Sequence, residues 1–232
     1  MGLTSSSTGS NLLADNFNIS ESDFTITLAG NPNVGKSTIF NNLTGMNQHT
    51  GNWTGKTVDN ATGNCTYNDK NFLLVDIPGT YSLVTHSKEE EIATSFISSN
   101  VSNATVVVVD ATCLERNLHL VFQIMEITPN VIVCVNLLDE AQKKKIKINL
   151  KLLSEILGIP VVGTTARNKK TLIHLLDTIY KVCTGEIKCS AKQLTFPNKC
   201  SDEEKVATIM KHCEEISDKV CSFSRNSCNS FD

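Results

Sequence analysis

The chain alternates short apolar, β-branched runs with stretches in which apolar residues recur every three or four positions. Continuous apolar runs indicate strands buried on both faces, and the second spacing indicates amphipathic helices. This alternation predicts an α/β fold of three layers, in which helices cover both faces of a mostly parallel sheet. An antiparallel hairpin is expected at one edge, over residues 58–76. The predicted strands are 24–30, 58–67, 71–77, 104–110, 131–137 and 159–165, and the predicted helices begin at 36 and span about 88–99, 114–126, 149–157 and 170–183.

Both ends of the chain depart from this alternation. Residues 1–22 are rich in Ser and Asn and are predicted to be a disordered leader, before a main domain at 23–186. Residues 187–200 read as a linker, and 201–232 as a helical appendage. Ser201 and Glu204 have capping-box spacing at its start. We expect its apolar stripe to pack on the main domain or on sequence outside the chain, with a membrane-surface or partner helix as the alternative; the stripe comprises Val206, Ile209, Met210, Cys213, Ile216 and Val220.

Composition narrows the function classes. A net charge of −3 over 232 residues gives no broad basic field, so nucleic acid is not an expected partner. The basic run at 143–147 is interpreted as a solvated helix or loop face. No apolar run approaches the roughly 20 residues that cross a bilayer. The nine cysteines include no CxxC pair, so they are interpreted as reduced thiols, with a metal or redox role for the six from Cys183 onwards as the alternative.

A glycine-rich stretch, GNPNVGKST, stands between the first predicted strand and the first predicted helix. It matches the phosphate-loop pattern G-x-x-x-x-G-K-[ST] in the context that the pattern requires. Glycine lets successive backbone N–H groups point at phosphate oxygens, and the helix N-terminus favours an anion. We expect the lysine to contact the β- and γ-phosphates and the serine hydroxyl to bind Mg²⁺. The stretch comprises Gly30, Asn31, Pro32, Asn33, Val34, Gly35, Lys36, Ser37 and Thr38.

A second motif, DIPGTYSL, follows a later predicted strand. We expect Asp76 to hold the Mg²⁺ shell through water, and the Gly79 N–H to bond the γ-phosphate and to be released on hydrolysis. Ile77 and Pro78 complete this turn. Many switch GTPases have a glutamine after the glycine that orients the attacking water, but Thr80 stands here. Its hydroxyl is too short for that role, so we expect slow hydrolysis that depends on cations and backbone N–H groups.

The polar stretch between these motifs, residues 47–59, is predicted to be a loop. Thr57 is its best candidate for a second hydroxyl ligand of Mg²⁺, in a segment that the nucleotide orders. A structural threonine in an exposed loop is the alternative. Tyr81 and Leu83, beyond the second motif, are interpreted as packing residues of a moving segment.

The motif NLLD follows another predicted strand, at the sheet edge where open α/β proteins bind ligands. The Asp139 carboxylate can accept from the guanine N1–H and 2-amino group, a contact that adenine cannot reproduce. Asn136 is expected to bond the base edge and to tie neighbouring loops together. Leu137, followed by Leu138, replaces the lysine of the usual Asn-Lys-x-Asp motif, so contact over the base remains but affinity is in doubt. A third loop would offer backbone N–H groups to guanine O6 from Thr164, Thr165 and Ala166.

In this order, GNPNVGKST, GNWTGKTVD, DIPGTYSL and NLLD make residues 24–186 resemble the N-terminal GTPase domain of ferrous iron transport protein B, in the Era/TrmE-like group. The resemblance implies GTP and GDP as ligands, Mg²⁺ held by Ser37, Thr57 and Asp76, and a catalytic set of Lys36, Thr57, Gly79 and Asn33. In potassium-activated relatives, the asparagine third before the phosphate-loop lysine binds K⁺. Asn33 matches it; the alternative is that Asn33 bonds only its own turn. The implied magnesium-side switch comprises Lys56, Thr57, Val58, Asp59 and Asn60.

For the whole protein, the resemblance implies a GTP-hydrolysing regulatory domain of a prokaryotic Fe²⁺ transporter. We expect the domain to lie at the cytoplasmic face of the cell membrane, with the permease region continuing beyond Asp232 as its partner. A homo-oligomer is compatible with the sequence. One alternative is a stand-alone Era/TrmE-like GTPase in ribosome assembly or tRNA modification. Another alternative is a P-loop small-molecule kinase that uses ATP; a kinase of this class should lack a guanine motif.

Overall fold

The computed structural model describes residues 22–45, 48–52, 59–83, 87–99, 101–196 and 201–223, with only the backbone described for 48–52, 59–60 and 202. The predicted leader lies outside the described residues except for its last residue, Ser22. The division into a main domain at 23–186, a linker at 187–200 and an appendage at 201–232 stays a prediction.

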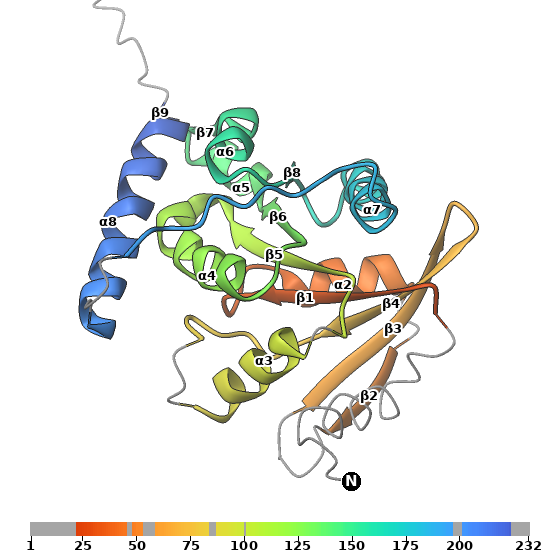
Figure 1. The fold of residues 1–232 in the computed structure, drawn as a ribbon. Helices are drawn as coiled ribbons and strands as arrows, with labels where there is room; N and C mark the ends of the chain where they lie inside the picture. Colours follow the sequence, from red (N-terminus) through yellow and green to blue (C-terminus); the bar gives the residue numbers. More distant parts are fainter. Residues whose placement is uncertain are drawn as a thin grey trace, which may run out of the picture.

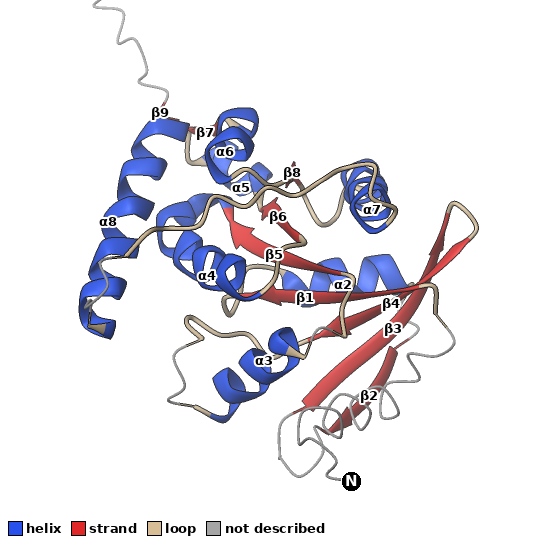
Figure 2. Ribbon diagram, viewed as in Figure 1, coloured by secondary structure: helices blue, strands red, loops and turns tan. Residues whose placement is uncertain are grey.

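Among the described residues, a seven-stranded sheet has the order β2-β3-β4-β1-β5-β6-β8 (Figures 1 and 2). The run from β4 to β8 is parallel, whereas β3 is antiparallel to both β4 and β2. The chain therefore crosses from one side of β1 to the other, which makes the carboxyl end of β1 a topological switch point. The strands are β1 (Phe24–Gly30), β2 (Gln48–Asn52), β3 (Asp59–Tyr67), β4 (Lys70–Asp76), β5 (Ala104–Asp110), β6 (Val131–Asn136) and β8 (Val161–Gly163).

Helices cover both faces of this sheet, as predicted (Figure 2). One face packs on α2 and α7, and the other on α3, α4, α6 and α8. The central strands are buried because nearly every side chain is apolar; in β5 the valines at 106–109 are at most 1% exposed. The helices are α2 (Lys36–Thr44), α3 (Lys88–Ser98), α4 (Leu114–Ile127), α5 (Leu138–Lys143), α6 (Leu150–Leu157), α7 (Lys169–Cys183) and α8 (Asp202–Val220), with a short 3₁₀ turn at Ala111–Cys113.

The edge hairpin is confirmed, with β3 and β4 joined by a turn in which Asn68 and Asp69 have φ of 48° and 56°. The prediction of a loop at 47–59 is wrong for β2, which pairs with β3 over Gln48–Asn52. Nothing in the polar sequence of β2 indicates a strand. Its backbone is ordered by hydrogen bonding to the open edge of β3, which is a tertiary effect.

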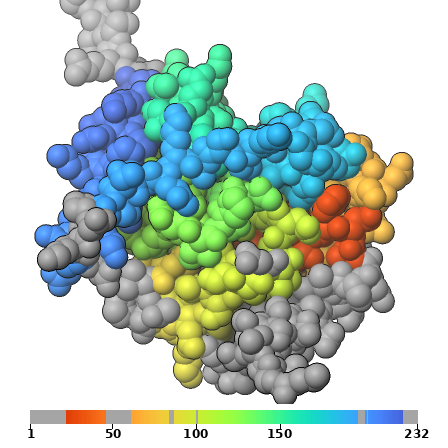
Figure 3. Space-filling view, in the orientation of Figure 1, coloured from red at the N-terminus to blue at the C-terminus, as the bar shows by residue number. Residues whose placement is uncertain are grey.

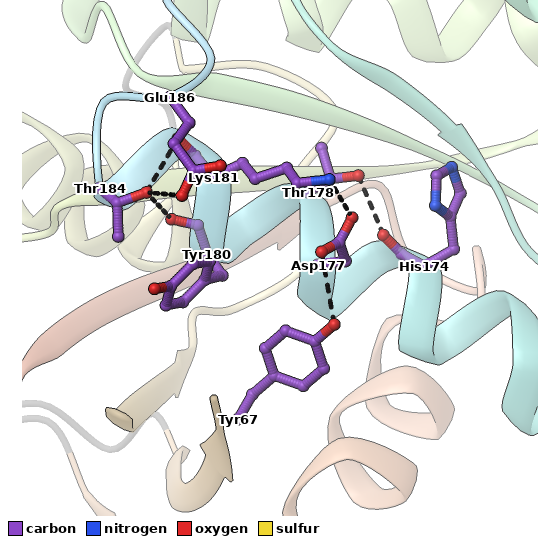
Figure 4. Close-up of polar contacts among 8 residues, drawn as sticks. All are labelled: Tyr67, His174, Asp177, Thr178, Tyr180, Lys181, Thr184 and Glu186. Carbon is purple, nitrogen blue, oxygen red and sulfur yellow. Dashed lines mark hydrogen bonds and ion pairs between the residues drawn. The ribbon is translucent and has the colours of Figure 1, made fainter. Parts of the chain in front are cut away.

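A polar network joins this hairpin to α7 (Figure 4). The Tyr67 hydroxyl donates to Asp177 at 3.4 Å, and Lys181 donates to the other carboxylate oxygen at 2.8 Å. The Tyr67 ring also meets Tyr180 edge to face, with centroids 6.1 Å apart. The Lys181 hydrogen bond and charge lower the pKa of the Asp177 carboxyl. These contacts connect the end of β3 to the helix that follows β8.

The predicted linker crosses the surface between α7 and α8 (Figure 3) and is held against the domain over its described part, 187–196. Ser190 N donates to Gly158 O at 2.9 Å, and Lys192 N donates to Leu157 O at 2.9 Å. Gly158 has φ 72° and its Cα faces the Ser190 carbonyl so closely that a Cβ would overlap it. Residues 187–196 are therefore packed against the domain and are not a flexible linker.

The appendage helix α8 begins with the predicted capping box, in which the Ser201 and Glu204 side chains each bond the other's backbone N–H. It packs on α4 with most of the predicted stripe buried, which confirms packing on the main domain. The exceptions are Val206, which is partly buried, and Met210, which is 59% exposed. Two short strands, β7 (Ile146–Ile148) and β9 (Cys221–Phe223), pair antiparallel and fix the end of α8. The basic run at 143–147 thus includes the end of α5 and the start of β7.

No helix in the described ranges is long and apolar enough to cross a membrane. Seven cysteines in these ranges are free thiols, as predicted. Burial raises the pKa of Cys134 and Cys213 to about 12, so both are protonated at neutral pH. Within the part of the chain that the structure describes, no three His, Cys, Asp or Glu side chains gather as metal ligands.

Candidate functional site

The phosphate-loop stretch connects β1 to the N-terminus of α2, at the switch point of the sheet. A Cβ on Gly30 would lie 2.6 Å from Val108 O, and one on Gly35, which has φ 84°, would overlap the Asn136 amide. Both positions therefore require glycine. Asn33 also has a left-handed backbone, with φ 66°, and is exposed together with Ser37 and Thr38.

Lys36 is buried beneath this loop and contacts the carboxyl end of β4. Its Nζ forms an ion pair with Asp76 and donates to Ile77 O at 2.7 Å. Burial raises the pKa of the Asp76 carboxyl, while the Lys36 charge and hydrogen bonds from Lys36 and Ser37 oppose that shift. The structure therefore brings the lysine, the serine hydroxyl and the carboxylate of two separate motifs together.

The chain after Asp76 lies against the phosphate loop. Ile77 N donates to Leu28 O at 3.2 Å, and Thr80 N donates to Gly30 O at 3.2 Å. A Cβ on Gly79 would be 3.3 Å from Pro32 Cα, so a larger residue would crowd the loop. Thr80 is 4% exposed, and its hydroxyl donates to Ser82 O at 2.5 Å. That hydroxyl is committed to its own turn.

Asn136, at the end of β6, is fully buried and joins three loops. Its Nδ2 donates to Val34 O at 2.9 Å. Its Oδ1 accepts from the Thr164 hydroxyl at 3.1 Å and from Ala166 N at 3.2 Å. The predicted tie between loops is present, and it occupies the amide on both sides.

Asp139 lies in the first turn of α5 and lines a 220 Å³ cavity with Gly35, Thr165 and Ala166. Leu137 lines the same cavity and precedes α5 with φ 61°, which turns the chain sharply out of β6. Part of the NLLD motif, the phosphate loop and the third loop thus surround one hollow. Leu138 instead points away from it, toward Gly163 in β8.

The backbone N–H groups of the third loop bond within the protein. Thr164 N donates to Val135 O at 2.7 Å, and Thr165 N donates to the Thr171 hydroxyl at 3.3 Å. Ala166 N donates to Asn136, as described above. A base oxygen bound here would have to share or exchange one of these bonds.

The predicted magnesium-side switch lies mainly outside the described residues. Lys56, Thr57 and Val58 are outside them, and Asp59 and Asn60 appear only as backbone at the start of β3. Their roles stay predictions.

Sequence reasoning missed three polar residues of α4 that contact the segment after Gly79. These residues are Arg116, His119 and Gln123, spaced three and four apart on one helix face. Arg116 lies over the Tyr81 ring, 4.4 Å from its centroid. Tyr81 is 46% exposed, so its interpretation as a packing residue is wrong, whereas Leu83 is buried. The available signal was that these three polar residues recur at helical spacing along α4.

Comparison with known proteins identifies the family of this arrangement. The family profile described as ferrous iron transport protein B matches residues 24–179. The chain belongs to that family. Within the family, the chain is 45% identical over 160 residues to the Fe(2+) transporter FeoB of Escherichia coli K12, a match that covers 66% of this chain and 21% of the relative. The chain thus spans about a fifth of the length of the curated relatives that it matches.

Solved FeoB structures have the same fold. The cytosolic domain of the T. maritima FeoB iron transporter in apo form superposes with a TM-score of 0.78 at 26% identity, covering 86% of this chain and 99% of that one. A mutant S. thermophilus FeoB N-terminal domain, solved bound to GDP, gives 0.67 at 34% identity, covering 85% of this chain and 73% of that one. These family members confirm the P-loop GTPase fold.

Proposed function

We propose that this chain binds guanine nucleotides and hydrolyses GTP, and that it regulates Fe²⁺ transport as part of a longer membrane protein. The observation that carries the proposal is the Asn136 amide, which joins the phosphate loop, the NLLD motif and the third loop into one site. The GDP-bound relative supports a guanine nucleotide as the ligand. The phosphates would lie on the Gly30–Thr38 loop, and the base in the cavity beside Asp139.

The oxygen donors near the phosphate loop fit Mg²⁺, which prefers hard oxygen ligands. The Ser37 hydroxyl is close enough to the Asp76 carboxylate to influence its pKa, and Thr57 would add a second hydroxyl. Mg²⁺ would neutralise charge on the β- and γ-phosphate oxygens. Lys36 would exchange its bond with Asp76 for the phosphates, and the Gly79 N–H would bond the γ-phosphate.

K⁺ near Asn33 belongs to the same proposal. Within the described part of the chain the Asn33 side chain is exposed and makes no hydrogen bond, so it is available to a cation. A cation there would supply charge that an arginine finger provides in other GTPases. Thr80 is already bonded to Ser82, which supports hydrolysis that depends on such charges. Equal turnover in K⁺ and Na⁺ buffers would remove this part of the proposal.

Asp139→Asn tests whether Asp139 contacts the guanine base, because the substitution should change the preferred nucleotide from GTP to XTP. The carboxylate would accept from N1–H and the 2-amino group of guanine, whereas an amide would donate to the 2-oxo group of xanthine. We expect the variant to bind GTP at least about tenfold more weakly and to gain XTP binding, because a mismatched polar pair leaves buried groups unpaired. Fluorescent-nucleotide titration of the 232-residue chain, with GTP, XTP and ATP as competitors, measures both changes.

Glu155→Gln is the matched control, since it makes the same carboxylate-to-amide change on the outer surface of α6. Glu155→Gln should keep the wild-type preference for GTP over XTP and ATP. Unchanged GTP preference in Asp139→Asn would exclude Asp139 from the base site. Displacement of GTP by ATP at similar concentrations in the wild type would contradict a guanine-specific site and favour a kinase.

A further inference from the structure

The segment after Gly79 rests on one face of α4. Gln123 makes two contacts with it: its Oε1 accepts from Leu83 N at 2.8 Å, and its Nε2 donates to Ser82 Oγ at 3.2 Å. One turn earlier, His119 lines the same cavity as Tyr81, and a further turn back Arg116 covers the Tyr81 ring. These three side chains, which we call the α4 platform, hold three consecutive residues.

The other end of the same segment is fixed to the phosphate loop. Thr80 N bonds Gly30 O, and the Thr80 hydroxyl bonds Ser82 O. Thr94, on α3, donates to Leu83 O at 3.2 Å. The position of the Gly79 N–H is therefore determined by contacts on both sides, and at the C-terminal side the α4 platform and Thr94 of α3 share them.

A 440 Å³ cavity beside Tyr81 gives this segment room to move. It lies between the phosphate loop, α4 and α8, and Asn31, His119 and Met210 are among its lining residues. Asn31 Oδ1 and His119 Nε2 are buried without a hydrogen-bond partner among the described residues. Unpaired buried polar atoms cost free energy, so a shifted segment that brings a donor into the cavity would be stabilised by them.

We propose that the α4 platform, and Gln123 above all, is a set of positioning residues that determines the preference of the site for GTP over GDP. This inference rests on the proposed function, in which the Gly79 N–H bonds the γ-phosphate. The β-phosphate and the base would be held by other loops, so the segment distinguishes the two nucleotides only through the γ-phosphate. Loosening the segment lowers GTP affinity and turnover, because ordering it then costs conformational entropy at each binding event.

Gln123→Met tests this inference because methionine has a similar length and forms neither hydrogen bond. We expect a non-hydrolysable GTP analogue to bind about tenfold more weakly, from the loss of two hydrogen bonds, and kcat to fall by a similar factor. GDP affinity should stay within about twofold of wild type. Gln193→Met is the matched control, since Gln193 donates to Met125 O of the same helix at 3.3 Å and does not contact the segment.

Ser82→Ala removes one of the two Gln123 hydrogen bonds, so its GTP-to-GDP affinity ratio should lie between those of the wild type and Gln123→Met. If Gln123→Met does not fold, Ser82→Ala alone tests the inference, by a lower ratio than that of the wild type. A purely structural role would instead lower the melting temperature and weaken GDP and the GTP analogue equally, which would overturn the inference. The inference would also be overturned if the wild type hydrolyses GTP and the GTP-to-GDP affinity ratio of Gln123→Met equals that of Gln193→Met. A wild type that binds no guanine nucleotide would overturn the proposed function itself.

Discussion

The buried Asn136 and the partly buried His119 show opposite outcomes of polar burial at this site. The Asn136 amide has a partner for both its oxygen and its nitrogen, so it stabilises the junction of three loops. The His119 imidazole has its Nε2 buried without a partner among the described residues. Burial lowers the pKa of His119 below its ordinary value of 6.5. The folded protein therefore favours a neutral imidazole next to the segment after Gly79.

That shift predicts a pH dependence of stability. Below the ordinary His pKa of 6.5, the unfolded chain binds a proton at His119 that the folded chain does not bind. The free energy of unfolding should therefore fall as the pH is lowered from about 7.5 to about 5.5. Urea denaturation at several pH values should show a flatter dependence for His119→Gln. The exposed His174 provides the control: His174→Gln should keep the wild-type slope, and equal slopes in all three proteins would contradict the burial argument.

At the scale of elements, α8 shows that an apolar stripe predicts a packed face only approximately. Ile209, Ile216 and Val220 are buried against the domain, whereas Met210 projects from the edge of the contact. On α4, Phe122 meets His212 of α8 edge to face, with centroids 5.4 Å apart. The helix that carries the α4 platform is thus also the helix that holds the appendage.

Paired substitutions on α8 test this burial pattern. Ile216→Ala, at a position 1% exposed, should lower the free energy of unfolding by about 2–5 kcal/mol, because it removes buried apolar contacts and leaves a cavity. Met210→Ala, at a position 59% exposed, should change it by less than about 0.5 kcal/mol. Chemical denaturation measures both, and similar losses would mean that the helix packs with a different face.

At the scale of the whole molecule, the candidate site and the end of the described chain are connected through short elements. Asp139 lies in the first turn of α5, β7 follows α5 closely, and β7 pairs with β9 at the end of α8. Asn149 N, just after β7, also donates to Val220 O at 2.8 Å. The NLLD motif is therefore linked to the end of α8 through α5, β7 and β9.

A longer transporter that includes this chain should reveal whether the nucleotide site acts on transport. In liposomes, Fe²⁺ flux through the wild type should respond to GTP. Asp139→Asn should shift that response to XTP, because the base contact alone is exchanged. Glu155→Gln should respond as the wild type does. A flux that responds to GTP equally in all three proteins would show that this site does not control transport.

The sequence by itself determined the α/β class, most strands and helices, and the motifs of the site, because apolar periodicity and glycine-rich spacing are local properties. Only the tertiary structure decided β2, α5, β7 and β9, whose polar or short sequences are ordered by neighbouring backbone. It also decided the pairing of Lys36 with Asp76 and the contacts of Gln123 with Ser82 and Leu83. These contacts join residues about forty positions apart. The parallel pairing of β1 with β4 brings Lys36, which follows β1, to Asp76, and the packing of α4 on β5 brings Gln123 to the segment after Gly79.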